Sequence, residues 1–484
     1  MRRVLAIFFA VIMVVGVGSA SAQSRTSYFM EGSYFRNNMN PALAPTRGYL
    51  ALPISGIGVG INSNFLSVDN LFYQRDGGLV TALHGSVTPE EFLGRLSDVN
   101  LLGVDTEVNI LSVGFHAGRT FWNFGVGANV NAQVSLSKDL FSFVKTLGNG
   151  TYDLASTAVD AQGYLNAYLG TSFPVCKWAN VGIRAKFLVG IADAHVGFDQ
   201  LTADVDSRSV VGTLRGNWRM NAIFLENQYV TPEGGYEVPQ GYNMWDVNRM
   251  LQNMKSYGGA IDLGAEFRFF NDHLKVSAAV TDLGFIKWNA ITNIGGQVNG
   301  GINFEGFDLE GDFAFDDWSF EPSASESYES YTSRLNCNLN VGVEYNILKN
   351  HIAFGLLSHT KFYKTTTLSE LTASVNFRPT NWITATVSHT FLSGNRPGIF
   401  GAALNIHPAV LNIFVGMDYI DTNLVVGPKV GEMQLYLPRY AKSLNVYAGV
   451  GFNFGRAKYV REAAAQQRAL RKAERNEQRQ QSVK

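Results

Sequence analysis

The sequence predicts an all-β protein, a transmembrane antiparallel β-barrel of about fourteen strands. Segments of about ten residues alternate between apolar side chains and polar or small ones, as strands do when one face meets lipid. The joints between these segments alternate between short and long. After the N-terminus no window offers roughly 18 uninterrupted apolar residues, which argues against membrane-spanning helices. Charged residues are only 16% of the chain, less than soluble domains usually carry.

The chain begins with a predicted export signal, residues 1–22. Arg2 and Arg3 precede an apolar run from Val4 to Val17, and small residues follow up to Ala22. A positive start, a short apolar stretch and an A-x-A site are typical of a secretory signal peptide. We therefore expect cleavage after Ala22 and a location outside the cytoplasm.

Residues 23–47 precede the first strand and are predicted to form a plug. Pro41 fixes its own φ and biases Asn40 toward extended geometry, so the turn that they form is stiff. A rigid segment rich in aromatic residues, at the mouth of a glycine-lined barrel, would serve as a gate. The candidate plug residues are Tyr28, Phe29, Tyr34, Phe35, Asn40, Pro41 and Ala42.

Residues 48–455 carry the alternating segments of the predicted barrel. Residues 124–134 place Phe, Val and Ala on one face and Gly, Asn and Gln on the other, and residues 335–345 and 444–454 follow the same pattern. A soluble sandwich can also alternate in this way, so the joints decide between the two folds. The short joints lie near residues 119–123, 176–180, 271–273, 348–350, 379–381 and 407–408.

Four joints are much longer than a compact soluble domain usually tolerates, namely 63–106, 138–159, 193–256 and 285–332. Outer-membrane barrels have tight periplasmic turns and long outer loops, and their strand number is even. We therefore expect an outer-membrane location with both termini in the periplasm. A further hairpin within Val210 to Arg219 would change the strand number by two.

Alternation also assigns charged side chains to the barrel lumen, where they avoid lipid. We favour a structural wall of ion pairs, and the alternative is a lining that selects a charged solute. The residues assigned to the lumen are Arg184, Lys186, Asp262, Glu266, Arg268, Lys275, Glu344, His359 and Lys361.

The long loops contain short amphipathic helices. Thr88-Pro89-Glu90-Glu91 is a capping box with proline at the first helical position, and residues 139–147 and 245–254 are also amphipathic. These helices either form small cores of their own above the barrel or offer an apolar surface to a solute. Their apolar candidates are Phe92, Leu93, Leu96, Phe141, Phe143 and Trp245.

Several kinds of chemistry find no support in the sequence. Cys176 and Cys337 are the only cysteines and form no metal-binding motif, so we expect no metal, no cofactor and free thiols. Ser-His-Thr occurs at residues 358–360 and 388–390, but neighbours on a strand point to opposite faces and cannot form a dyad. Glycines 56, 58 and 60 lie in a strand pattern with no helix after them, unlike a dinucleotide site. We expect no enzyme.

The charge distribution argues against nucleic acid as a partner. Residues 456–484 carry nine Lys/Arg and three Glu, whereas residues 23–455 carry a net charge of −9. Alanines among these charges predict a basic, helical periplasmic tail. Because it has few large apolar residues, we do not expect the tail to insert into lipid.

Asn40-Pro41-Ala42-Leu43, just ahead of the first strand, resembles the turn in the hatch of the long-chain fatty-acid transporter family. The resemblance implies a fourteen-stranded outer-membrane barrel with an N-terminal plug and outer helices that capture a hydrophobic solute. Residues 281–288, Thr-Asp-Leu-Gly-Phe-Ile-Lys-Trp, and the whole chain are more similar to an uncharacterised Bacteroidota barrel family of unknown function. The start of the mature chain at Gln23 lacks the glycine-rich opening of fatty-acid transporters, so no fatty-acid substrate is implied.

Two functions fit these observations. The first is capture or passage of a hydrophobic or amphipathic small solute across the outer membrane, with residues 23–47 as the gate. The second is a scaffold without transport, which anchors a surface or secretion assembly through its long loops and tail. The expected partners are outer-membrane lipid and either a hydrophobic ligand or an envelope protein.

Overall fold

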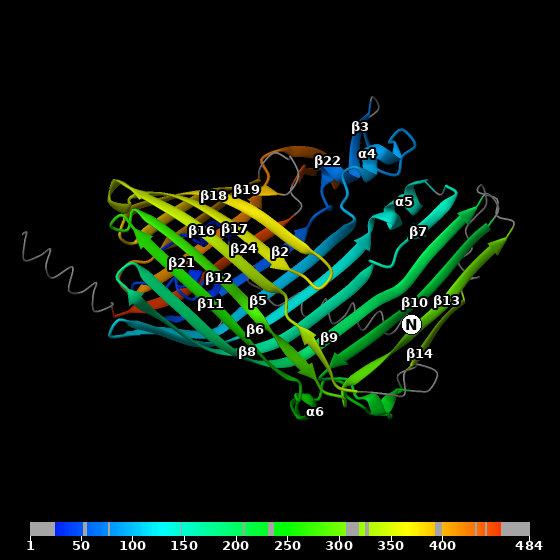
Figure 1. Cartoon of the computed structure of the whole chain (residues 1–484), viewed down its shortest axis with the longest axis horizontal. Coiled ribbons are helices and arrows are strands. Elements are labelled where there is room, and N and C mark those ends of the chain that lie inside the picture. Colours follow the sequence, from blue (N-terminus) through cyan, green and yellow to red (C-terminus); the bar gives the residue numbers. More distant parts are fainter. Residues whose placement is uncertain are drawn as a thin grey trace, which may run out of the picture.

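The computed structural model describes residues 25–51, 56–75, 78–146, 148–206, 209–230, 237–305, 319–324, 329–392, 399–430, 433–440 and 443–455. Its main feature is a closed antiparallel barrel with fourteen strand positions (Figure 1). β1 (Gly48–Ala51) and β2 (Gly56–Ser63) share the first position. The others, in chain order, are β5 (Val99–Ala117), β6 (Thr120–Ser137), β8 (Ala158–Cys176), β9 (Ala179–Asp206), β11 (Tyr257–Phe269), β12 (Leu274–Trp288), β16 (Cys337–Ile347), β17 (Ile352–Phe362), β18 (Thr367–Thr380), β19 (Ile383–Leu392), β20 (Ile399–Ile406), β21 (Leu411–Ile420) and β24 (Leu444–Phe454).

The last strand closes the barrel against the first. β24 pairs with β21 through Leu411 and Phe452, and with β1 through Gly48 and Phe454. The same strand continues along β2, where Ile57 faces Ala448. A closed sheet leaves no unpaired edge in lipid, which is the condition for a β-structure to cross a membrane.

Side chains alternate between lipid and lumen along these strands, as predicted. β24 alternates exposed and buried positions along its whole length. Phe124, Phe187, Phe285 and Val387 are exposed on the outer surface, while polar residues fill the inside. The pattern is that of an outer-membrane-type barrel, in which lipid covers the apolar exterior.

Turn lengths define the two ends of the barrel. The predicted short joints are short in the structure, as between Phe269 and Leu274 and between Thr380 and Ile383. One of them contains the 3-10 turn η4 (Leu348–Asn350), where Lys349 has a positive φ of 55°. We call this side the short-turn end and the opposite side the long-loop end. β1 begins and β24 finishes at the short-turn end.

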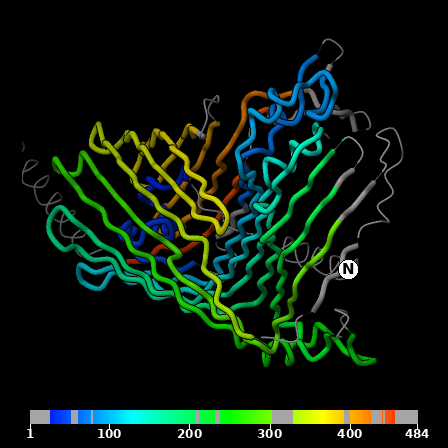
Figure 2. The backbone as a smooth tube through the Cα atoms, turned by 45° about the vertical axis from the view of Figure 1, so that its right-hand side comes forward, coloured from blue at the N-terminus to red at the C-terminus, as the bar shows by residue number. Residues whose placement is uncertain are grey.

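The joints 193–256 and 285–332 are only partly loops, which corrects the sequence prediction. β9 has 28 residues and extends beyond the barrel, where it pairs with β10 (Ser209–Ala222). β10 pairs with β13 (Asn293–Glu305), and β13 with β14 (Ser319–Ala324). Figures 1 and 2 show this sheet projecting past the long-loop end. The short strands β7 (Gly150–Asp153) and β15 (Tyr331–Arg334) pair with β9 and β12.

Short elements cover parts of the long-loop end. They are α3 (Val68–Leu71), the hairpin of β3 (Phe72–Arg75) and β4 (Gly78–Thr81), α4 (Pro89–Leu93), α5 (Lys138–Thr146), η2 (Asn227–Tyr229), α6 (Val247–Asn253), and the hairpin of β22 (Leu424–Val430) and β23 (Met433–Pro438). The predicted N-cap is present, since the Thr88 side chain accepts a hydrogen bond from the Glu91 N–H. Among the described helices, none has the length and apolar character needed to cross a membrane. Cys176 and Cys337 are free thiols, as expected.

Candidate functional site

Residues 25–47, the N-terminal segment, lie inside the barrel (Figure 2). The segment holds a 3-10 turn, η1 (Arg25–Ser27), and one helical turn, α2 (Arg36–Met39). Tyr28, Phe29, Tyr34 and Phe35 are at most 4% exposed, and the Asn40 to Ala42 turn is also buried. The structure therefore brings all the candidate plug residues together in the lumen. The predicted signal, residues 1–22, and the predicted tail, residues 456–484, lie outside the described residues.

Glycines of the inner wall make room for this segment. A Cβ added at Gly182 would lie 2.2 Å from the Pro41 carbonyl carbon, and one at Gly264 would lie 2.1 Å from Asn40 Oδ1. Both contacts are with atoms of the turn itself. Strands β9 and β11 can therefore approach the turn this closely only because they carry glycine at these two positions. Similar contacts join Gly342 to Tyr28, Gly355 to Phe29, Gly401 to Thr26 and Gly451 to Tyr34.

Hydrogen bonds hold the turn in place. Asn40 Oδ1 accepts from the Ala42 N–H at 2.9 Å, and Asn40 Nδ2 donates to the Tyr28 hydroxyl at 3.1 Å. The Ala42 carbonyl accepts from Asn180 Nδ2 of β9 at 2.6 Å. The side chain of Asn40 thus fixes the shape of the turn, while the Ala42 carbonyl connects it to the barrel wall.

The start of the segment is anchored deeper in the lumen. The backbone N–H groups of Arg25 and Thr26 donate to the Asp418 carboxylate at 3.0 and 3.1 Å. The Arg25 guanidinium forms an ion pair of 2.5 Å with Glu370. Thr26 Oγ1 is also 2.7 Å from Ser388 Oγ. These contacts join the segment to strands β18, β19 and β21.

Aromatic stacking fills the space between the segment and the wall near the short-turn end. Tyr34 stacks on Tyr49 of β1 with ring centroids 4.6 Å apart, and Phe35 lies 5.1 Å from Phe414 of β21. Each such pair adds about 0.5–1.5 kcal/mol beyond the burial of its area.

The lumenal charges assigned from alternation are inside the barrel, and most are paired. Lys186 Nζ lies 2.9 Å from Asp262 and 2.6 Å from Asp282, and Arg184 lies 3.5 Å from Asp262. Arg184 also donates to Asn37 Oδ1 of the N-terminal segment at 2.6 Å. The ion pairs thus connect wall to wall and wall to segment.

Other predicted lumenal residues form two more groups. Lys361 pairs with Asp105 at 2.5 Å, and His359 Nδ1 is 2.8 Å from Asn340 Oδ1. At the short-turn end, Arg268 pairs with Glu266 at 2.6 Å. Lys275 pairs there with Glu344 at 3.5 Å and more closely with Glu31 of the N-terminal segment.

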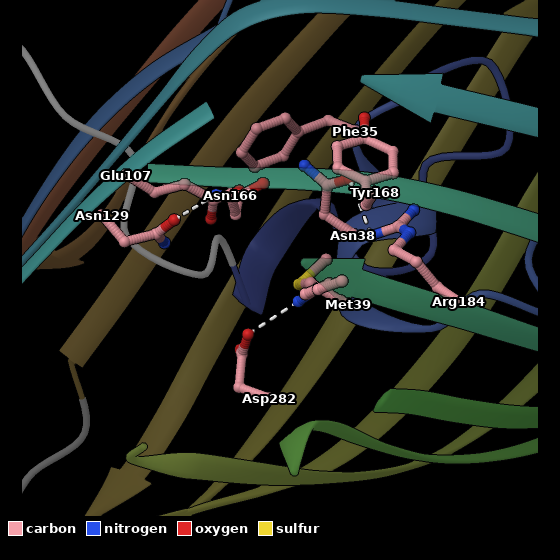
Figure 3. A pocket seen from close by; sticks show the side chains of 10 residues that line it. Phe35, Asn38, Met39, Glu107, Asn129, Asn166, Tyr168, Arg184 and Asp282 are labelled. Atoms are coloured by element: carbon pink, nitrogen blue, oxygen red, sulfur yellow. Dashed lines mark hydrogen bonds and ion pairs between the residues drawn. The ribbon is translucent and has the colours of Figure 1, made fainter. Parts of the chain in front are cut away.

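Above the segment, toward the long-loop end, lies a small polar chamber (Figure 3). Phe35, Asn38 and Met39 of the segment line it on one side, and Glu107 and Asp282 line it on the other. Its volume is about 30 Å³, and an adjoining chamber beside Arg25 and Lys361 measures about 50 Å³. Spaces of this size hold a few water molecules, whereas small-molecule sites usually measure about 300–1,000 Å³.

Sequence reasoning missed several residues of this lumen. Thr281 and Asp282 both face the lumen, although neighbours on a regular strand point to opposite faces. The cause is local: Asp282 has a φ of 62°, and the register between β11 and β12 shifts beside it. A bulge of this kind breaks strict alternation. Glu370 and Asp418 follow the alternation of their strands and were predictable from it.

The outer apolar candidates lie in separate small cores. Phe92 and Leu96 are buried with Phe65 and Tyr73, and Leu93 and Phe141 pack against this group. Phe143 packs with Tyr152 in another cluster, whereas Trp245 is 56% exposed beside Phe224. The structure therefore does not bring the six residues into one groove.

The two Ser-His-Thr stretches face opposite ways. His359 is buried in the lumen, whereas His389 lies on the outer face next to Phe391 and Phe400. Within the described ranges, no group of three or more His, Cys, Asp or Glu residues is arranged to hold a metal ion.

Residues 41–418 match a family model described as "Family of unknown function (DUF5723)". No curated protein matches the sequence. Solved structures similar to this fold include the Ralstonia pickettii toluene transporter TbuX, at 9% identity and a TM-score of 0.40, covering 91% of this chain and 96% of that one. The Pseudomonas putida toluene transporter TodX has 8% identity, a TM-score of 0.36 and coverages of 90% and 95%. A Pseudomonas aeruginosa FadL homologue has 11% identity, a TM-score of 0.35 and coverages of 90% and 99%.

Proposed function

We propose that this chain, which belongs to the DUF5723 family of unknown function, passes a hydrophobic or amphipathic small solute across the outer membrane. The observation that carries the proposal is the position of the N-terminal segment, which fills the middle of the lumen and leaves chambers of about 30 and 50 Å³ on its long-loop side. Passage through the lumen therefore requires the segment to leave its seat, so the segment is the gate.

The contacts of the segment suit a gate because they are reversible. Hydrogen bonds and ion pairs hold Arg25 and Asn40, and no disulfide joins the described segment to the wall. The wall behind the segment combines glycines and polar residues with the aromatic rings of Tyr49 and Phe414, so moving the segment opens a passage with both polar and apolar lining. Exposed Leu79 and Leu83 at the long-loop end would give the solute an apolar first contact. This combination favours an amphipathic solute.

A reversible tether tests the gate. Thr26→Cys with Ser388→Cys, in a chain whose two native cysteines are replaced by alanine, places two thiols where the hydroxyl oxygens are 2.7 Å apart. The matched control is Thr360→Cys with Ser369→Cys, because those hydroxyls are 3.0 Å apart on two strands of the wall, away from the segment. Uptake of alkyl glycosides, alkyl carboxylates and monoaromatic compounds is then measured in liposomes.

We expect oxidation of the first pair to stop uptake and reduction to restore it, while the control pair leaves uptake unchanged. Unchanged uptake in the tethered protein would disprove the gate. If the untethered protein takes up no compound, and native mass spectrometry in mild detergent also detects no lipid-like ligand, the transport proposal is wrong.

One observation favours the second candidate function, a scaffold without transport. The sheet of β9, β10, β13 and β14 projects beyond the barrel, and passage through the lumen does not need it. A projecting sheet offers a surface on which another protein could assemble. Crosslinking from the β10 position Val211, which is 42% exposed, would test this in intact envelopes. A reproducible protein partner together with an absence of solute uptake would favour the scaffold.

A further inference from the structure

A larger cavity opens at the short-turn end of the barrel. It has a volume of about 400 Å³ and lies between the N-terminal segment and the turns that follow β11 and β16. Four cationic side chains line it, namely Arg36, Arg268, Lys275 and Lys349. Arg36 belongs to α2 of the segment, and the other three belong to the barrel.

The cations of this cavity differ in how they are neutralised. Lys275 is paired with Glu31 and Glu344, and Arg268 is paired with Glu266. Lys349 is exposed at the rim. Arg36 is only 6% exposed, and within the ranges that the structure describes no salt bridge joins it to a carboxylate. Its Nε is fully buried without a partner.

A buried guanidinium without a partner is unusual. Removing a charge from water costs several kcal/mol unless another charge or a set of hydrogen bonds compensates for it. The cavity holds three carboxylates, Glu31, Glu266 and Asp272, against its four cations. Glu31 is already engaged by Lys275 and by Asn350 Nδ2 at 2.9 Å. Glu31 attracts Arg36 electrostatically but is already paired with Lys275, and Glu344, the other partner of Lys275, does not line the cavity. An anion in the cavity would therefore give Arg36 the direct partner that it lacks.

We propose that this cavity binds a small oxyanion, a carboxylate or a phosphate, through Arg36. The planar fork of a guanidinium donates two parallel hydrogen bonds to such groups. Leu43 and Ala44 are the main apolar lining, and the rest is polar or charged, so the cavity suits a small hydrophilic anion rather than a long alkyl chain.

The position of the site gives the anion a second effect. Arg36 moves with the N-terminal segment, whereas Arg268 and Lys349 stay with the wall, so a bound anion bridges the two parts. A ligand that binds only the seated arrangement stabilises it. This consequence rests on the proposed gate, but anion binding does not.

Titration calorimetry on the full chain in a neutral detergent tests the site. Inorganic phosphate and succinate are the two probes, and glucose is the uncharged control. The variants are Arg36→Gln, Arg36→Lys and Lys349→Gln, together with Arg439→Gln as a distant exposed arginine, paired with Asp69 at 3.4 Å near α3. Heat-modifiable gel mobility confirms that each variant keeps its barrel.

We expect the native chain to bind one or both anions, Arg36→Gln to weaken that binding at least tenfold, and Arg36→Lys to restore part of it. Arg439→Gln should leave the affinity unchanged and Lys349→Gln should reduce it less than threefold. Equal affinity in the native chain and Arg36→Gln overturns the proposal, as does the absence of binding of both anions at 10 mM. Because the readout is binding and not uptake, failure of the gate would leave this result standing.

Discussion

At the scale of single residues, the segment and the wall fit because certain side chains are absent. Gly182 is the clearest case, since an added Cβ would meet the Pro41 carbonyl carbon at 2.2 Å, and a backbone atom cannot rotate away. We expect Gly182→Ala to reduce the free energy that holds the N-terminal segment in the lumen by about 1–3 kcal/mol, the usual cost of overpacking a filled interior.

Hydrogen exchange of residues 25–47 measures this effect. Gly163→Ala is the matched control, because its Cβ would meet only ordinary contacts, the nearest at 3.7 Å from Val130. Faster exchange of the segment in Gly182→Ala alone is the expected result. Equal exchange in both variants would mean that the turn does not rest on β9.

Glu31 gives the seating of the segment a defined pH dependence. Burial alone would raise the pKa of Glu31, but Lys275, and then Arg378, outweigh burial and hold the pKa well below its ordinary value of 4.5. A lowered carboxylate pKa adds stability that is complete above the unfolded pKa and is lost as the pH falls below it. Exchange of the segment, corrected for intrinsic rates, should therefore stay constant from pH 8 to 5 and rise below about pH 4.5. Glu31→Gln should remove this change, and a rise already near pH 6 would contradict the assignment.

At the scale of elements, alternation and turn chemistry made most of the barrel predictable. The sequence predicts the short joints and the N-cap at Thr88 correctly, because a two-residue period and a cap are local properties. β10 and β13 fall mostly within predicted loops, because β10 pairs with β13 and with the far end of β9 over long sequence separations that local patterns do not reveal. Asp282 was missed for a related reason, since a bulge that depends on the neighbouring strand turned it inward.

The outer cluster around α4 is an element that can be tested apart from the barrel. Phe92 is 2% exposed and packs with Phe65, Tyr73 and Leu96. Phe92→Ala should destabilise this cluster by about 3–5 kcal/mol, the usual cost of removing a buried aromatic ring. Limited proteolysis within residues 64–98 should become faster while the heat-modifiable mobility of the barrel stays unchanged. Leu83→Ala is the control, because Leu83 is 56% exposed. Loss of the barrel in Phe92→Ala would show that the cluster is required for its assembly.

At the scale of the whole molecule, the sequence predicts the barrel. It predicts only in part which residues occupy the lumen and what they contact there. The strand number follows from the count of alternating segments, and closure follows from the need to leave no edge in lipid. The glycines predict that residues lie inside the lumen, but the sequence does not predict the ion pair of Arg25 with Glu370 or the position of Arg36 beside the short-turn cavity. Those depend on which strands meet at a given depth, and that is set by the registers of fourteen strands together.

Turn lengths also predict how the molecule is oriented in the membrane. The start of β1 and the end of β24 lie at the short-turn end, and outer-membrane barrels keep their short turns in the periplasm. In a chain without native cysteines, Asn149→Cys should therefore react with an impermeant maleimide on intact cells, because Asn149 lies in an exposed loop at the long-loop end. Asn381→Cys, in an exposed turn at the other end, should react only after lysis, and Asn350→Cys should behave likewise. The reverse pattern would place the anion cavity beside Arg36 on the cell surface and the projecting sheet in the periplasm, and the direction of the proposed passage would be reversed with it.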